Sequence, residues 1–385
     1  MEDILLKRMA VRSTGFMLDV IMISVVCRNY NGIEIFANAN KISDNVETSS
    51  LNVDDKKSMN NMMLSSIEKD GDYGNPEKIL RDKYIIVKKP SSKESEISLE
   101  DLYMEHSIQI TVSGLKPEEL DSDSVIRVNK QEHFKGEPLA KEGDFVQNIG
   151  ITYDYNTEQR KNTATIHVEL DSVYAYSLYQ DNQNYYINLQ NPRDVYDKLI
   201  VIDAGHGGND VGTFPKDMSY FEKDINLSVV LNLKELLDLE DIKVYYTRLT
   251  DVKPYLKPRV NLANDLDADL FISIHCNGSD LGQPHGTEVL YNEKWKGQGF
   301  GSKELADICI DELTKTIGLR NRGLVKGSEK YIVGHSKVPV ALIEVAYMTN
   351  QKDLEFLKDS NNHKLAAKGI YNGIMRYYEE YDNKN

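Results

Sequence analysis

The sequence predicts an α/β domain, with a central mixed sheet flanked by helices, preceded by a small β-sandwich domain. Two patterns along the 385 residues predict this organisation. Between residues 102 and 192, apolar and polar residues alternate, as they do in strands that bury one face. From residue 199 onward, apolar strands alternate with amphipathic helices, which is typical of a layered α/β domain. With 40% apolar residues, the chain is able to bury a sizeable core.

The first hundred residues have a different character. Lys7, Arg8 and Arg12 precede an apolar run at residues 15–27, which has the length of a signal-peptide core and is shorter than the roughly 20 residues of a membrane span. We expect residues 1–30 to be a signal or anchor segment, with an ordinary N-terminal helix as the alternative. Because residues 38–83 are rich in Asn, Ser, Asp and Lys, we expect residues 31–100 to be a disordered spacer.

The β-rich domain is expected at residues 101–193. Alternating apolar residues predict its strands in five segments: HSIQITV (106–112), NIGITYDY (148–155), TATIHVEL (163–170), VYAYSLY (173–179) and NYYINLQNP (184–192). Several short strands with no long helical run favour a sandwich. Tyrosines are frequent in the last two segments, where they either stack on sugars or fill a small core: Tyr174, Tyr176, Tyr179, Tyr185 and Tyr186.

The α/β domain is expected at residues 196–382. Its first strand, 199–204, is apolar almost throughout, as a strand covered on both faces should be. The elements then follow in this order: helix 223–239, strand 242–248, helix 259–266, strand 270–277, strand 287–291, helix 302–317, strands 330–334 and 340–346, and a last helix from about 361 to 380.

Charge and cysteine content exclude some functions. With 46 basic and 61 acidic residues the net charge is −15, which repels nucleic acid and anionic lipid, so contact with a membrane is expected only through the N-terminal segment. Three cysteines do not make a disulfide framework, and Cys276 and Cys309 lie among apolar residues. We expect both to be buried free thiols.

Two histidines follow apolar strands of the α/β domain. His206 lies in VIDAGHGGND directly after the first strand, and His275 ends the strand LFISIH. Strand ends of one sheet are where sites gather, so these two side chains are expected to converge. Glu222 precedes the first long helix, and Glu344 lies inside the apolar strand VALIEVA. A carboxylate in such a strand is costly to bury unless a cation or a proton compensates it.

These residue types are the ones that a catalytic zinc site requires. Three ligands drawn from histidine and carboxylate leave a fourth position open for water, and a further carboxylate takes the proton of that water. His206, Glu222 and His275 are the candidate ligands and Glu344 the candidate base, with His285 and His335 as substitute ligands. The remaining four histidines are expected at the surface: His106, His133, His167 and His363. The sequence has no H-E-x-x-H, G-x-S-x-G or phosphate-loop motif.

The order of motifs resembles a known family. VIDAGHGGND, EKD, YYTR, RVNLAN, ADLFISIHCN, NRGL and ALIEVAYMTN are similar to the zinc-dependent N-acetylmuramoyl-L-alanine amidases of the amidase-3 type, over about residues 199–378. The resemblance implies a phosphorylase/hydrolase-like fold and hydrolysis of the amide between the lactyl group of N-acetylmuramic acid and L-alanine in peptidoglycan. It also implies Zn²⁺ bound by His206, Glu222 and His275, with Glu344 as the catalytic residue.

The resemblance carries further expectations. The protein would be secreted and act outside the cell or in the envelope of a bacterium, with peptidoglycan as its partner. The β-rich domain is similar in placement to AMIN domains, which implies wall binding. Only about two dozen residues separate His275 from the helix near Ser302, too few for a long inhibitory helix, so the site is expected to be open without an activating partner. The alternatives are a zinc peptidase that cuts the stem peptide and a catalytically silent peptidoglycan-binding protein.

Overall fold

The computed structural model describes residues 82–92, 95–115, 145–156, 161–180, 182–295, 297 and 300–382, together with the backbone of a few short strands elsewhere. The chain divides into two compact units. Unit 1 comprises Met1–Leu102 and His106–Asn191, and unit 2 comprises Tyr103–Glu105 and Pro192–Asn385. Apart from the backbone of short strands, the predicted signal or anchor segment lies outside the described residues, as does most of the predicted spacer.

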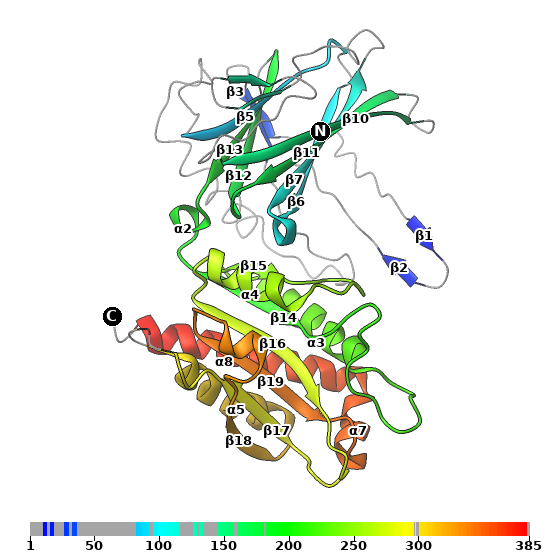
Figure 1. Ribbon diagram of the computed structural model, residues 1–385, viewed down its shortest axis with the longest axis vertical. Coiled ribbons are helices and arrows are strands. Elements are labelled where there is room, and N and C mark those ends of the chain that lie inside the picture. The colour runs from blue at the N-terminus through cyan, green and yellow to red at the C-terminus, as the bar shows by residue number, and fades with distance from the viewer. Residues whose placement is uncertain are drawn as a thin grey trace. The chain divides into compact units, whose positions relative to one another are not determined.

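Unit 1 contains two antiparallel sheets (Figure 1). One has the strand order β10-β11-β7-β6, with β6 (Glu96–Leu102), β7 (Ser107–Leu115), β10 (Val146–Asn156) and β11 (Lys161–Leu170). The other has the order β3-β4-β12-β13-β5-β8-β9, with β3 (Cys27–Tyr30), β4 (Ile33–Phe36), β5 (Lys83–Lys88), β8 (Ile126–Val128), β9 (Gln131–His133), β12 (Ala175–Gln180) and β13 (Asn184–Gln190). A separate pair is formed by β1 (Val11–Ser13) and β2 (Phe16–Leu18).

One apolar core joins the two sheets of unit 1. Ile110 and Ile166 from one sheet and Ile187 from the other belong to the same buried cluster. The alternation that predicted the strands therefore places their apolar faces inward, and the predicted sandwich is confirmed. Strand β5 lies within the range predicted as spacer, yet Ile85 and Val87 are fully buried in this core. Unit 1 therefore starts before residue 101.

Unit 2 is built on a six-stranded mixed sheet with the order β15-β14-β16-β19-β17-β18. Strands β14 (Leu199–Ala204), β15 (Lys243–Tyr246), β16 (Leu270–Asn277) and β19 (Val340–Tyr347) are parallel. Strand β17 (Thr287–Tyr291) runs antiparallel to β19, and β18 (Asn321–Lys326) is parallel to β17. This arrangement brings the ends of β14, β16 and β19 and the starts of β17 and β18 to one edge of the sheet.

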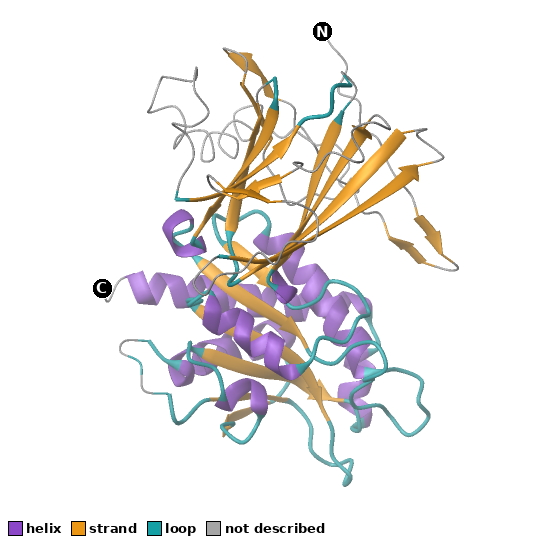
Figure 2. Cartoon of the chain, turned by 45° about the horizontal axis from the view of Figure 1, so that its top comes forward, coloured by secondary structure: helices purple, strands orange, loops and turns teal. Residues whose placement is uncertain are grey.

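Helices cover both faces of this sheet (Figure 2). On one face α3 (Glu222–Leu237), α5 (Ser302–Ile317) and α8 (Ser360–Asp382) pack on one another and on the strands. Alternate residues of β14, Ile200 and Ile202, join their core, as do Val230 and Leu233 of α3. On the other face α4 (Leu256–Asp265) contacts β14, and α6 (Tyr331–Gly334) contacts β19. The predicted mixed sheet flanked by helices is confirmed.

From residue 192 onward, four short elements of the described chain were not predicted correctly. Residues 330–334 were predicted as a strand, but 331–334 form α6. The ring of Tyr331 stacks on that of His335 with centroids 4.0 Å apart, a spacing of four residues that a helical turn brings together. Strand β18 and the helices α2 (Pro192–Val195) and α7 (Gln351–Leu357) were not predicted. Among the described residues, no helix is both long and apolar enough to span a membrane.

Candidate metal centre

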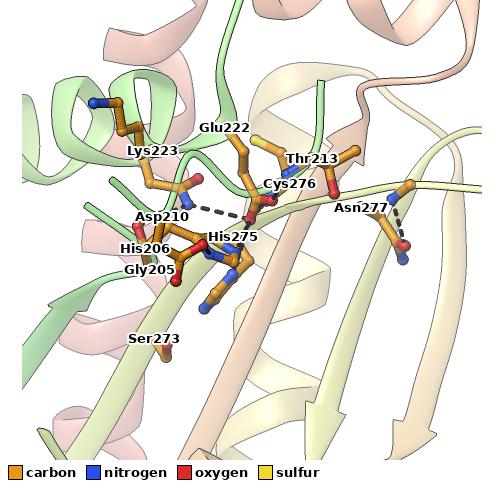
Figure 3. A network of polar contacts seen from close by, with 12 residues as sticks. Gly205, His206, Asp210, Thr213, Glu222, Lys223, Ser273, His275, Cys276 and Asn277 are labelled. Atoms are coloured by element: carbon orange, nitrogen blue, oxygen red, sulfur yellow. Dashed lines mark hydrogen bonds and ion pairs between the residues drawn. The ribbon is translucent and has the colours of Figure 1, made fainter. Parts of the chain in front are cut away.

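His206, Glu222 and His275 come together at the carboxyl edge of the sheet. His206 follows β14, Glu222 begins α3, and His275 lies near the end of β16. Each offers one ligand atom, and these atoms all lie within 4.8 Å of one another. Oε1 of Glu222 is 3.2 Å from Nε2 of His206 and 2.8 Å from Nδ1 of His275. Figure 3 shows the three side chains pointing toward one another. The predicted ligands therefore form a candidate metal site.

Glycines allow this close approach. A Cβ on Gly205 would lie 2.3 Å from the His275 ring, and one on Gly212 would lie 2.5 Å from Oε2 of Glu222. His206 itself has φ of 61°, a left-handed conformation that residues with a side chain seldom adopt. The turn after β14 is therefore built so that the imidazole of His206 faces back toward Glu222 and His275.

Neighbouring polar groups orient the ligands. Nδ1 of His206 lies 2.9 Å from Oδ1 of Asp210, so the carboxylate favours the tautomer with the proton on Nδ1 and leaves Nε2 to face Glu222. Glu222 accepts hydrogen bonds from the backbone N–H of Thr213 at 2.7 Å and of Cys276 at 3.1 Å. With its side chain only 3% exposed, Glu222 is held in one place.

The pKa shifts of the three candidate ligands favour their charged forms. Burial alone would raise the pKa of Glu222, but the hydrogen bonds from His206 and His275 outweigh it and hold the pKa well below its usual value. Burial would lower the pKa of both histidines, yet the hydrogen bond to Glu222 raises the pKa of each. Two imidazoles and one buried carboxylate are a donor set that suits zinc with an open position.

Glu344 lies beside this group. It is the direct neighbour of His275 in the pairing of β16 with β19, so the two side chains project from the same face of the sheet. Its Oε2 is buried and has no hydrogen-bond partner among the described residues. Burial raises its pKa to about 7, although His275 opposes the shift. A carboxyl group with these properties is suited to accept and return a proton.

The other candidates lie elsewhere. Within the described part of the chain, neither His285 nor His335 belongs to a group of possible metal ligands. His363 was predicted at the surface but is buried, and its two ring nitrogens are satisfied by hydrogen bonds with Ser228 Oγ and the carbonyl of Leu357. Cys276 is buried in the core on the opposite side of β16 and, like Cys309, is a free thiol, as predicted.

Supporting residues were missed by the sequence analysis. Asp210 and Asn226 each follow a ligand by four residues, and Nδ2 of Asn226 donates to Oε1 of Glu222 at 3.3 Å. On α3 that spacing alone could have indicated the contact of Asn226. Arg248 and Arg259 occur in the quoted motifs YYTR and RVNLAN, but no role was given to either.

Comparison with known proteins identifies the family of unit 2. The amidase-3 family model, described as N-acetylmuramoyl-L-alanine amidase, matches residues 200–376. The uncharacterised protein YqiI of Bacillus subtilis (strain 168) is 36% identical over 183 residues, which are 48% of this chain and 86% of that protein. The N-acetylmuramoyl-L-alanine amidase CwlM of Bacillus licheniformis is 31% identical over 181 residues, or 46% of this chain and 68% of CwlM. The chain belongs to the N-acetylmuramoyl-L-alanine amidase family.

Other members of the amidase family match a similar share of this chain. LytC of Bacillus subtilis (strain 168), an N-acetylmuramoyl-L-alanine amidase, is 35% identical over 190 residues, which are 49% of this chain but only 37% of LytC. The solved catalytic domain of CwlV, from Bacillus (Paenibacillus) polymyxa var. colistinus, is 33% identical, covers 47% of this chain and 98% of that chain, and has a TM-score of 0.44. Family membership supports amide hydrolysis in peptidoglycan as the chemistry of unit 2.

Proposed function

We propose that this chain is a zinc-dependent hydrolase that cleaves the amide between the lactyl group of N-acetylmuramic acid and L-alanine in peptidoglycan. The observation that supports it most is the convergence of His206, Glu222 and His275 beside Glu344 at one edge of the sheet. A catalytically silent binding protein would have no need for this set of side chains. Bound there, Zn²⁺ would supply a Lewis acid that polarises the amide carbonyl and makes water more acidic.

The side chains of the chain itself handle the proton. Glu344, with a pKa near 7 in the protein without metal, takes a proton from the attacking water and delivers it to the departing alanine nitrogen. Asp210 keeps the His206 ring in one tautomer, and the amides of Thr213 and Cys276 keep Glu222 in place. None of these groups has to reorganise as the reaction proceeds.

Digestion of purified peptidoglycan, with and without a chelator, tests the proposal. Mass analysis is expected to show free muramic lactyl groups and intact stem peptides, and these products are expected to vanish with the chelator and return with zinc. Shortened stem peptides would identify a zinc peptidase instead. No products at all would favour a silent binding protein.

The remaining expectations concern location and unit 1. We propose that the protein acts in the cell envelope or outside the cell, with residues 1–30 as signal or anchor and the β-rich domain of unit 1, predicted at residues 101–193, as an AMIN-like wall-binding domain. The relatives named as cell wall amidases support the location. The tyrosines do not support sugar stacking, because Tyr174, Tyr179, Tyr185 and Tyr186 are buried. Co-sedimentation with peptidoglycan, compared between the full chain and a chain lacking unit 1, tests wall binding.

The segment between His275 and α5 is where a long inhibitory helix would lie if the site were regulated by one. Its described residues contain β17 and loops but no helix. We therefore propose that the site works without an activating partner. A large increase in the rate of peptidoglycan digestion on adding a partner protein would contradict this.

A further inference from the structure

Two buried arginines hold the backbone around the candidate metal ligands. Arg259, on α4, donates from Nη1 to Oδ1 of Asp203 at 2.6 Å and to the carbonyl of Ala204 at 2.7 Å. Its Nη2 donates to the carbonyl of His206 at 2.7 Å. The side chain is 3% exposed, so water does not compete for these bonds. One guanidinium group thus binds the backbone of the candidate ligand His206 and the end of strand β14 that leads to it.

Arg248 continues this set of contacts. It donates from Nε to the carbonyl of Ala204 at 2.9 Å and from Nη2 to the carbonyl of Gly205 at 2.8 Å. The same Nη2 also donates to the carbonyl of Lys223 at 2.9 Å, directly after the ligand Glu222. Together the two arginines hold three consecutive carbonyls, from residue 204 to 206, and the backbone beside a second ligand. These carbonyls lie where the chain leaves β14.

Asp203 extends the network to the third ligand. Its Oδ1 also accepts a hydrogen bond from Thr247 Oγ1 at 2.5 Å, and its Oδ2 accepts one from Ser273 Oγ at 2.6 Å. Ser273 is two residues before His275 and projects from the same face of β16. The Asp203 carboxylate therefore links the strand that leads to His206 with the strand that carries His275.

The conformation of His206 explains why such a network is needed. The left-handed backbone conformation of His206 is unfavourable for a residue with a side chain. Such a conformation persists only where the surrounding contacts stabilise it by more than it costs. Arg259 supplies a charged, fixed donor on the carbonyl of that residue. We propose that Arg248 and Arg259, the latter joined to Asp203, are positioning residues that preset His206 and Glu222 for the metal. This inference rests on the proposed function for the identity of the ion, zinc.

Lysine variants of the full-length protein test the proposal. Arg259→Lys and Arg248→Lys keep the positive charge, but a single ammonium nitrogen lacks the separate Nε, Nη1 and Nη2 donors with which the guanidinium fork reaches acceptors at several places at once. Arg193→Lys is the matched control. Arg193 makes the same kind of contacts, to the carbonyl of Asp267 and to Asp269 at 2.8 Å, near the start of β16 rather than its end.

Two measurements are made on each variant. Zinc affinity is measured by competition with a chromophoric chelator, and hydrogen exchange of the amides at residues 205–212 is measured in the chelated protein. We expect Arg259→Lys and Arg248→Lys to lower zinc affinity by roughly 10- to 100-fold, the usual effect of removing a group that orients a ligand. We also expect faster exchange at residues 205–212, with neither change in Arg193→Lys. Melting of the chelated proteins shows how far each variant is destabilised.

The results separate a positioning role from a merely structural one. If the two variants melt earlier but keep the zinc affinity and the local exchange of the unaltered protein, the proposal is wrong. It is also wrong if Arg193→Lys changes both quantities equally. If the unaltered protein binds no zinc, the proposed function fails, while the exchange measurement still decides whether the arginines fix the backbone of residues 205–212.

Discussion

At the scale of single residues, Glu344 is distinguished by a buried oxygen with no hydrogen-bond partner among the described groups and by a pKa raised to about 7. Glutamine has the same shape but cannot accept the proton of water. We expect Glu344→Gln to keep its bound zinc and to lose about 10²- to 10⁴-fold in the rate of amide hydrolysis. Metal analysis and product analysis on the same sample check this.

His206→Ala is the comparison for Glu344→Gln. Because it removes one of the three ligands, it is expected to lose both zinc and activity. A Glu344→Gln protein that keeps full activity at equal zinc content would contradict the assignment of Glu344 as the base.

Asp210 acts on a ligand rather than on the substrate. Asp210→Asn replaces the carboxylate that fixes the His206 tautomer, so we expect zinc affinity to fall by roughly 10- to 100-fold. Asp217→Asn is the control, since Asp217 is in the same loop region but accepts its hydrogen bonds from Ser219. Competition with a chromophoric chelator measures both. Equal affinities in the two variants would show that Asp210 has no orienting role.

The four candidate site residues could be predicted from the sequence because each differs clearly from its immediate sequence neighbours. His206 and His275 follow apolar strands, and Glu344 is a carboxylate in an otherwise apolar strand. The roles of Arg248 and Arg259 could not be predicted, because their partners are backbone carbonyls tens of residues away. Any arginine can bind any carbonyl, so composition and spacing carry no signal for such a contact.

At the scale of elements, the approach of β14 to β16 depends on Gly205. A Cβ there would lie 2.3 Å from the ring of His275, closer than any real contact. We expect Gly205→Ala to displace this ring, to destabilise unit 2 by about 1–3 kcal/mol and to weaken zinc binding. Gly318→Ala, at the left-handed end of α5 where nothing lies within 4 Å of the new Cβ, is expected to cost only stability. Denaturation and zinc titration separate the two effects.

The length and burial of each element explain which helices and strands could be predicted from the sequence. Strands β14 and β16 and helix α5 were predicted with the bounds that they have, because the two strands are nearly continuous apolar runs and the helix is long and amphipathic. Strand β18 has no fully buried residue, so its sequence shows no alternation to detect. Helix α6 has only four residues, and its buried pair Ile332 and Val333 suits a strand equally well.

The Asp203 network that links β14, β15 and β16 predicts how stability depends on pH. Burial alone would raise the pKa of Asp203, but Arg259 and the hydrogen bonds from Ser273 and Thr247 lower it. A lowered pKa means that the carboxylate stabilises the fold above its unfolded pKa, about 3.9, and that this contribution is lost as the pH falls through the lower folded value. We expect the free energy of unfolding of unit 2 to fall with acid over this window.

The Asp203→Asn variant checks the origin of this loss. It is expected to be less stable at neutral pH, since Arg259 loses its partner charge, and to lose less stability between neutral pH and the acid window. Urea unfolding at several pH values measures both. Parallel curves for the two proteins would mean that Asp203 does not contribute to the acid sensitivity.

At the scale of the whole molecule, the two units have separate cores, and the candidate metal ligands all belong to unit 2. A ligand that binds only the folded state stabilises the unit that holds it, by about 2.7 kcal/mol when its free concentration is 100 times Kd. We therefore expect calorimetry of the chelated protein to show a transition of unit 2 that rises on adding zinc, while the transition of unit 1 stays where it was. The His206→Ala protein is expected to show no such rise. Equal shifts of both transitions, or a rise in the variant, would place zinc outside this site.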